Sequence, residues 1–275
     1  MRFTKMHGAG NDYVYVNCFA EPVPADIPAT AIAVSDRHFG IGGDGLVLIG
    51  PSDKADARMR MFNADGSEAE MCGNGIRCVA KHVVDAGFVR GDTVRIDTAA
   101  GVLACEVQRG ADGRVASVAV DMGRPELGDA GSGRMVAVEA GDRTFDITAV
   151  SMGNPHAVIF GDGIATVEFA GRYGPLVERD AARFPQRTNV EFASLRAGGI
   201  DVVVWERGCG ITLACGTGAC ATAVAAVVDG MARAGEEIPV RLPGGQLGIT
   251  VEPGLGSVSM RGPATLVYSG ELLLD

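Results

Sequence analysis

The sequence predicts a mixed α/β fold made of two similar domains, each a β-sheet wrapped around a central helix. One short glycine-rich motif occurs twice at a fixed distance, and each copy lies between a strand pattern and a helix pattern. The chain has 275 residues, which is enough for two domains of about 140 residues each. These observations indicate a duplicated unit.

The repeat is visible as a constant offset. The motif Cys-Gly-Asn-Gly at 72–75 recurs as Cys-Gly-Thr-Gly at 215–218, and 215 − 72 = 143. The pair Gly-Asn at 10–11 recurs at 153–154, and 154 − 11 = 143. Coincident offsets of this kind are typical of an internal duplication. We therefore expect each domain to present one Cys-Gly-x-Gly turn.

A helix is predicted after each motif. In the first copy, apolar residues follow the i, i+3, i+4, i+7 pattern of an amphipathic helix, which we expect to end near Gly87: Ile76, Val79, Ala80 and Val83. The second copy is apolar on nearly all sides over 219–228, which is typical of a central buried helix.

Strands are predicted before each motif and between the repeats. Short apolar or alternating segments have the composition of β-strands: 59–62, 94–97, 115–121 and 202–205. Asn63 ends the strand before the first motif, and Glu206 occupies the same place before the second, because 206 − 63 = 143. Turns are expected at 243–245 and 253–254.

Composition excludes several classes of protein. The 24 Lys and Arg residues against 34 Asp and Glu give a net charge of −10, which disfavours nucleic-acid binding.

The uncharged segment 208–228 is long enough to span a bilayer, but its four glycines and three threonines favour a strand, a turn and a buried helix. No secretory signal pattern begins the sequence, so we expect a cytoplasmic protein without membrane contact.

The cysteines are too few and too dispersed for a disulfide scaffold. There are seven of them, an odd number, and we expect reduced thiols. Their spacing does not match the usual zinc ligand pairs, so no metal site is predicted. Five are interpreted as buried filler: Cys18, Cys78, Cys105, Cys209 and Cys220. Recurrence in the repeat singles out Cys72 and Cys215.

A cysteine at a helix N-terminus has an unusual electrostatic environment. The unpaired N–H groups and the helix dipole stabilise an anion there. We expect this to lower the pKa of the thiol from about 8.5. The same N–H groups could bind a substrate carboxylate, because glycine permits close approach of the backbone.

Two such thiols on opposite faces of one carbon atom would suit stereoinversion. One thiolate removes the α-proton and the other, as a thiol, returns a proton from the far side. The weakly acidic α-carbon requires stabilisation of an enediolate, which paired helix N-termini could provide. Other polar residues in these segments have simpler interpretations: His156 as a structural histidine, Asn11 and Asn154 as turn residues, and Glu206 with Arg207 as a surface ion pair.

Taken together, the motifs resemble those of the diaminopimelate epimerase family. The similarity follows the chain in order from its start to YSGE at 268–271, and the motifs that carry it are KMHGAGND at 5–12, FNADGSE at 62–68, MCGNG at 71–75, GNPH at 153–156, TNV at 188–190, WERG at 205–208 and ACGTG at 214–218. In combination these motifs are highly specific.

The resemblance implies a cofactor-independent isomerase that interconverts LL- and meso-diaminopimelate in lysine biosynthesis. Cys72 and Cys215 match the family's proton donor and acceptor, in an order set by the direction of reaction. His156 and Glu206 match residues that tune the cysteines. The substrate-binding positions implied are Asn11, Asn63, Gly73, Asn74, Asn154, Asn189, Glu206, Arg207, Gly216 and Thr217.

The family fold implies two pseudo-symmetric domains with the active site in the cleft between them. We assign 1–118 with a returning strand at 263–275 to the first domain and 119–262 to the second. Family members are often homodimers, and Tyr268 matches a dimer contact, so we expect a homodimer. Some members carry a glutamine in the loop where this chain has Gly-Gly-Asp-Gly at 42–45, and we leave Asp44 out of the site.

Three alternatives remain open from the residues alone. A proline or hydroxyproline racemase also uses two cysteines in such turns, but Glu206 and Arg207 suit a substrate with a second ammonium and carboxylate. A pyridoxal-phosphate racemase needs a Schiff-base lysine, and the candidates are Lys5, Lys54 and Lys81. A thiol redox or metal-binding protein would more commonly carry a Cys-x-x-Cys motif.

Overall fold

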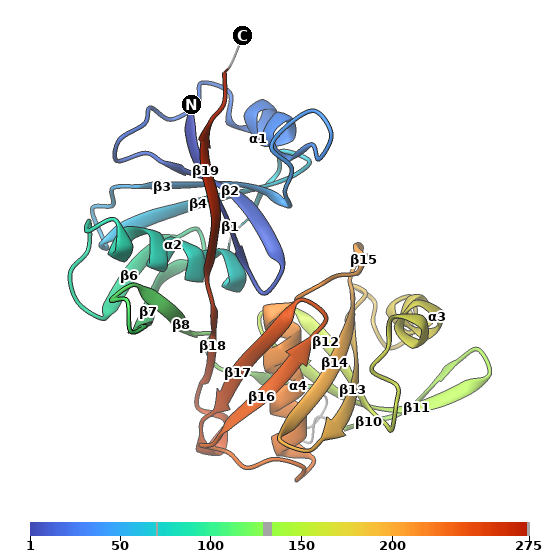
Figure 1. The fold of residues 1–275 in the computed structure, drawn as a ribbon. Coiled ribbons are helices and arrows are strands. Elements are labelled where there is room, and N and C mark those ends of the chain that lie inside the picture. Colours follow the sequence, from blue (N-terminus) through green and yellow to red (C-terminus); the bar gives the residue numbers. More distant parts are fainter. Residues whose placement is uncertain (70, 129–133, 274–275) are drawn as a thin grey trace. The chain divides into compact units, whose positions relative to one another are not determined.

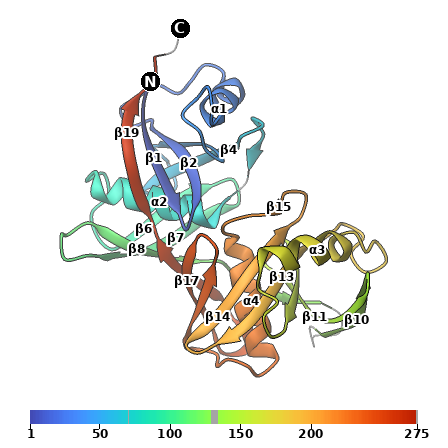
Figure 2. The ribbon, with the colours of Figure 1, turned by 45° about the vertical axis from the view of Figure 1, so that its right-hand side comes forward.

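The fold is described from a computed structural model that covers residues 1–69, 71–128 and 134–273. The chain divides into two compact units (Figures 1 and 2). Unit 1 comprises Met1–Val120 and Arg261–Asp275, and unit 2 comprises Asp121–Met260. Each unit combines a mixed sheet with two α-helices, so the predicted fold class is confirmed.

Unit 1 is built around strands that pair both parallel and antiparallel. Its elements are β1 (Arg2–Gly8), β2 (Asn11–Asn17), α1 (Ile27–Ser35), β3 (Gly45–Gly50), β4 (Ala57–Asn63), β5 (Glu68–Ala69), α2 (Gly73–Asp85), β6 (Thr93–Thr98), β7 (Gly101–Arg109), β8 (Val115–Asp121) and β19 (Thr265–Glu271). Strand β18 (Val258–Pro263) crosses from unit 2 into unit 1.

Unit 2 has a corresponding set of elements. They are β9 (Glu126–Leu127), β10 (Arg134–Ala140), β11 (Arg143–Ser151), β12 (Pro155–Phe160), α3 (Val167–Glu178), β13 (Asn189–Arg196), β14 (Gly199–Glu206), β15 (Gly210–Ile211), α4 (Gly216–Val228), β16 (Glu237–Leu242), β17 (Gly245–Val251) and the 3-10 turn η1 (Pro253–Leu255).

The pairing of the strands repeats between the units. In unit 1, β1–β2 is antiparallel, β2–β3 parallel, β3–β4 antiparallel, β4–β6 parallel and β6–β7 antiparallel. In unit 2, β11–β12, β12–β13, β13–β14, β14–β16 and β16–β17 follow the same order of directions. The duplication inferred from the 143-residue offset is therefore present in the topology.

The central helices carry the motifs to equivalent places. Helices α2 and α4 each have 13 residues and begin directly after a cysteine. Helix α2 is amphipathic, and Gly87 follows it with a φ of 77°, a left-handed conformation that glycine adopts without strain. Helix α4 is buried along most of its length (Figure 2), as the apolar sequence predicts.

The strands expected from the sequence are also confirmed. Segments 59–62, 94–97, 115–121 and 202–205 lie in β4, β6, β8 and β14. No helix in the described part of the chain is long and apolar enough to cross a membrane.

Candidate functional site

Cys72 occupies the N-cap of α2. Its φ of −136° and ψ of 120° are extended, so the backbone turns into the helix at Gly73. Asn63 ends β4 nine residues earlier, and its side-chain amide donates to the hydroxyl of Ser67 at 3.0 Å. The strand, the connecting loop and the helix start therefore place Cys72 at the end of the unit 1 sheet.

The thiol of Cys72 faces an oxygen. Its Sγ donates to Oδ1 of Asn11 at 3.4 Å, and Nδ2 of the same amide donates to Oδ2 of Asp44 at 2.7 Å. Asp44 also forms an ion pair with Arg37 at 3.0 Å. Because Asp44 accepts from Nδ2, the amide of Asn11 is oriented with its oxygen toward the sulfur.

A fully buried guanidinium lies behind the first turn of α2. Arg77 is 0% exposed, and it donates to the carbonyl of Gly73 at 3.0 Å, to Oδ1 of Asn74 at 2.8 Å and to the carbonyl of Pro263 at 3.2 Å. These bonds fix the backbone of the motif and tie it to β18. They also place a positive charge in the interior of unit 1.

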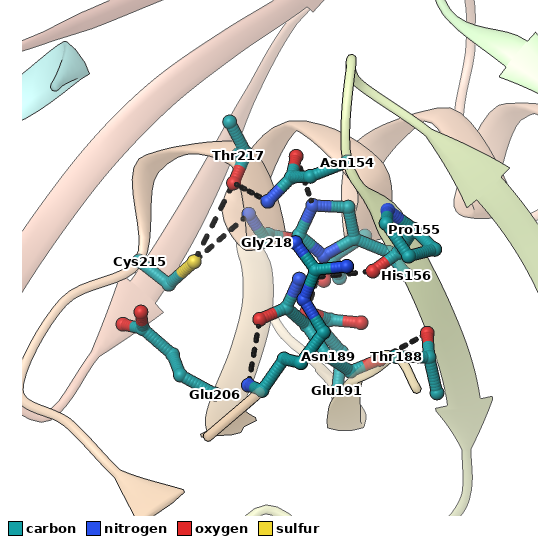
Figure 3. Close-up of polar contacts among 12 residues, drawn as sticks. Asn154, Pro155, His156, Thr188, Asn189, Glu191, Glu206, Cys215, Thr217 and Gly218 are labelled. Atoms are coloured by element: carbon teal, nitrogen blue, oxygen red, sulfur yellow. Dashed lines mark hydrogen bonds and ion pairs between the residues drawn. The ribbon is translucent and has the colours of Figure 1, made fainter. Parts of the chain in front are cut away.

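Cys215 is the N-cap of α4 and faces donors instead. Its Sγ accepts from the backbone N–H of Gly218 at 3.4 Å and lies 3.6 Å from Oγ1 of Thr217 (Figure 3). The residue is buried, with 7% exposure. The cysteine thus caps its own helix, which Cys72 does not.

The pKa of Cys215 differs from the expectation. Burial raises this pKa well above its ordinary value, and the negative charges of Glu206 and Glu191 raise it further. The hydrogen bonds from Thr217 and Gly218 act in the opposite direction but are weaker. Desolvation and two carboxylates therefore outweigh the helix N-terminus, and the resting form of Cys215 is the thiol.

A chain of hydrogen bonds leads from Cys215 into the core of unit 2 (Figure 3). Nδ2 of Asn154 donates to Oγ1 of Thr217 at 3.3 Å, and Oδ1 of Asn154 lies 3.0 Å from Nε2 of His156. Nδ1 of His156 lies 2.7 Å from Oε1 of Glu191. Burial raises the pKa of Glu191, although the imidazole opposes this effect.

The remaining predicted residues of unit 2 line the loop before α4. Glu206 ends β14 and accepts a short hydrogen bond from the hydroxyl of Thr212. Asn189 accepts from the backbone N–H of Arg207 at 2.9 Å and donates to the carbonyl of Pro155 at 2.9 Å. Gly216 is the first residue of α4.

The predicted residues therefore form two groups, one in each unit. Unit 1 brings together Asn11, Cys72, Gly73 and Asn74 near the start of α2, with Asn63 at the end of β4. Unit 2 gathers Asn154, His156, Asn189, Glu206, Arg207, Cys215, Gly216 and Thr217 around the start of α4. Tyr268 belongs to neither group: it lies on β19, with its ring edge against Phe3 and the ring centroids 5.9 Å apart.

Three contributors to these groups are missing from the sequence-based set: Asp44, Arg77 and Glu191. The sequence contains a feature that could have identified Glu191 as a candidate, because it is a charged residue inside the largely apolar segment 189–195. Arg77 is not among the apolar positions that predicted the helix, yet the structure buries it completely. Asp44 was left out of the site because its loop lacks the glutamine that some family members carry, yet its carboxylate accepts a hydrogen bond from Asn11.

The described residues contain no group of three or more His, Cys, Asp or Glu side chains able to hold a metal ion. All seven cysteines are free thiols. The two helix starts therefore offer thiols, amides and backbone N–H groups for acid–base chemistry and for binding a carboxylate.

A family model for diaminopimelate epimerase matches residues 3–128 and 148–267. This chain belongs to the diaminopimelate epimerase family. The resemblance inferred from the motifs is thereby confirmed.

Relatives in this family match along almost the whole chain. The diaminopimelate epimerase of Pelotomaculum thermopropionicum is 50% identical over 281 residues, which cover 98% of both chains. That of Acetivibrio thermocellus is 48% identical over 286 residues, covering 100% of this chain and 99% of the relative.

More distant solved structures share the fold of this diaminopimelate epimerase family member. A phenazine biosynthesis protein from Bacillus anthracis has a TM-score of 0.75 at 17% identity, covering 100% of this chain and 99% of that one. A probable proline racemase from Agrobacterium radiobacter has a TM-score of 0.70 at 17% identity, covering 100% of this chain and 93% of that one. The two-unit α/β architecture is thus common to proteins with several different names.

Proposed function

We propose that this protein interconverts LL- and meso-diaminopimelate without a cofactor, using Cys72 and Cys215 as an acid–base pair. The observation that carries the proposal is the equivalent N-cap position of one cysteine in each duplicated unit. Family membership supplies the substrate. The two thiols are proposed to act on opposite faces of the substrate α-carbon.

The charges around Cys215 suggest how the reaction begins. In the first half-reaction Cys215 donates a proton as a thiol, while Cys72 removes one after it has lost the thiol proton that it otherwise donates to Asn11. A substrate ammonium group bound by Glu206 would offset one of the charges that raise the pKa of Cys215. Substrate binding would then ease transfer of its proton.

The enediolate needs stabilisation that the starts of α2 and α4 could supply. Unpaired backbone N–H groups at both helix starts would donate to the reacting carboxylate as its charge increases. The residues proposed to bind substrate are Asn11, Asn63, Gly73, Asn74, Asn154, Asn189, Glu206, Arg207, Gly216 and Thr217. The proposed modulators of the two thiols are His156 and Glu206.

The decisive experiment is proton NMR of LL-diaminopimelate in D2O with no cofactor added. We expect the wild type to remove the α-proton signal and to produce the meso isomer. Cys72→Ala and Cys215→Ala should both abolish conversion. Cys209→Ala is the matched control, because Cys209 is exposed and outside the motifs, and it should retain full activity.

Other outcomes would redirect the proposal. Exchange on proline, but not on diaminopimelate, would keep the two-thiol chemistry and change the substrate. Activity dependent on added pyridoxal phosphate, or stoichiometric zinc in the purified protein, would overturn the cofactor-independent mechanism. Full activity after peroxide treatment would contradict the need for reduced thiols.

The assembly is proposed to be a homodimer in the cytoplasm. Strand β19 supports the dimer, because it presents exposed apolar side chains at Leu266, Val267 and Tyr268. Two thiols that must stay reduced support a reducing compartment. Light scattering should give twice the chain mass for the wild type and a smaller mass for Tyr268→Arg; a monomeric wild type would refute the dimer.

A further inference from the structure

Unit 2 contains a buried acid–histidine pair to which the proposed reaction assigns no complete role. The side chains of Glu191 and His156 are both 0% exposed, and they lie 2.7 Å apart. Oε2 of Glu191 has no hydrogen-bond partner in the described structure. A buried polar pair of this kind adds little stability over a well-packed apolar pair, so a role in the site is the more economical explanation.

The pair controls which nitrogen of His156 carries a proton. If the shared proton lies on Glu191, the carboxylic acid donates to Nδ1 and the neutral ring must carry its own proton on Nε2. If the proton lies on His156, both ring nitrogens are protonated. A neutral ring that donates from Nδ1 to an ionised Glu191 would leave Nε2 without a proton, facing Oδ1 of Asn154 at 3.0 Å. The contact with this oxygen selects the states in which Nε2 is protonated and donates to Asn154.

That proton fixes the orientation of the Asn154 amide. With Oδ1 occupied by His156, Nδ2 points to Oγ1 of Thr217 at 3.3 Å. Thr217 has a single hydroxyl proton, and because its oxygen accepts from Asn154, that proton is available for the sulfur of Cys215. A flipped Asn154 would accept the proton instead and remove a donor from the thiolate.

Glycine in the motif provides the space for this arrangement. A Cβ atom added to Gly218 would lie 2.8 Å from Oε1 of Glu191 and 3.2 Å from Sγ of Cys215. The carboxylate therefore lies against the first turn of α4, where the helix dipole favours negative charge. Glu191 and Cys215 share one crowded helix start, which couples the pair to the thiol directly.

We propose that Glu191 is a positioning residue for Cys215: it keeps a proton on Nε2 of His156, and so aligns Asn154 and Thr217 to donate to the Cys215 thiolate. The inference rests on the proposed function only in taking Cys215 as an acid–base group. It deepens that function by assigning a role to a carboxylate that is fully buried.

The test uses the full-length protein labelled with 15N, and His156→Gln identifies the ring signals of His156. In the wild type, the 15N spectrum should show a proton on Nε2 of His156. Glu191→Leu should lose this signature, and Glu191→Gln should retain it, because its amide can donate to Nδ1.

Activity should fall in the variant that loses the proton on Nε2 of His156 and should be kept in the variant that retains it. For Glu191→Leu we expect kcat to fall about 10- to 100-fold, as for other partners that orient a functional histidine, with most of the loss restored in Glu191→Gln. Thr148→Val is the matched control. It removes a partly buried hydrogen bond of 2.8 Å to Asp229, at the opposite end of α4, and should leave both readouts unchanged.

The outcomes separate the possible failures. A folded Glu191→Leu protein that keeps the Nε2 proton, or that keeps wild-type kcat, would overturn the positioning role. Equal losses in Glu191→Leu and Thr148→Val would show general destabilisation and would also overturn it. If the wild type epimerises nothing, the proposed function fails, whereas the ring signature still tests the alignment. If Glu191→Leu does not fold, the 15N spectrum of Glu191→Gln tests the proposal instead. Loss of the Nε2 proton of His156 in that variant would refute it.

Discussion

The two cysteine turns have the same backbone but opposite electrostatic surroundings. At the start of α2, the buried charge is the guanidinium of Arg77. At the start of α4, carboxylates of Glu191 and Glu206 act on Cys215. Cys72 donates to an amide oxygen, whereas Cys215 accepts from a backbone N–H.

This difference separates what the duplication preserved from what has diverged. The strand order, the helix length and the N-cap position repeat, while the side chains behind the cysteines do not. By the 143-residue offset, Arg77 corresponds to Cys220 (77 + 143 = 220) and His156 corresponds to Tyr13 (156 − 143 = 13). Acid–base chemistry on two faces of one carbon needs such asymmetry, because only one of the two thiols should hold the proton at any moment.

The largest effect is expected from replacing Arg77, the buried cation of unit 1, and it is an effect on stability. Arg77→Met should lower the free energy of unfolding by about 3 kcal/mol, because buried oxygens of Gly73, Asn74 and Pro263 lose a donor. Urea unfolding measures the change. The exposed Arg58 is the control, and Arg58→Met should stay within about 0.5 kcal/mol of the wild type. Equal stability of all three proteins would show that Arg77 is not a structural centre of unit 1.

The second test compares glycines at matching places in the motifs. Gly218→Ala should reduce kcat about 100-fold, because the new methyl group meets Glu191 and Cys215 in a close-packed interior. Gly75→Ala should change kcat by less than about threefold, since the added Cβ meets the flexible end of Met59 at 3.1 Å and alanine favours a helix. Steady-state kinetics distinguish them, and similar losses in both would remove the proposed asymmetry.

The third test is the reactivity of the two thiols. At about pH 8, iodoacetamide should modify Cys215 about tenfold more slowly than Cys72, because Cys215 is buried and its raised pKa keeps it protonated. Raising the pH should accelerate modification of Cys215, since a higher pH forms its thiolate. Peptide mapping by mass spectrometry measures both rates, and faster modification of Cys215 would reverse the assignment of the resting thiol.

The smallest effect concerns a single charge. Glu206→Gln should lower the pKa of Cys215 by removing one negative neighbour, and so speed its alkylation at about pH 8 about threefold. Glu168→Gln, at an exposed position in the first turn of α3, should have no effect on this rate. An unchanged or slower reaction in Glu206→Gln would mean that the charge of Glu206 does not control the pKa of Cys215.

The fold was predictable from the sequence wherever the information was local. The apolar spacing after Cys72 gave the span of α2, and the constant offset gave the duplication. The environment of each thiol, in contrast, is formed by residues that are distant in the sequence. Glu191 reaches His156 across 35 residues because β12 and β13 pair in parallel, with His156 opposite Asn189. The helix N-terminus suggested a lowered thiol pKa, but burial and the carboxylates of Glu206 on β14 and Glu191 on β13 reversed that effect at Cys215.

Strand β19 has a consequence for the order in which the protein folds. It pairs with β1 from Arg2 to His7, and the backbone groups of Met1 and Leu272 bond to each other. Unit 2 is one continuous segment, whereas unit 1 is interrupted by it. During synthesis, unit 2 can fold as soon as it leaves the ribosome, but β1 waits for the last part of the chain. Until then the edge of β1 is open to strands from other molecules, so a ribosome that stops early leaves unit 1 ready to aggregate.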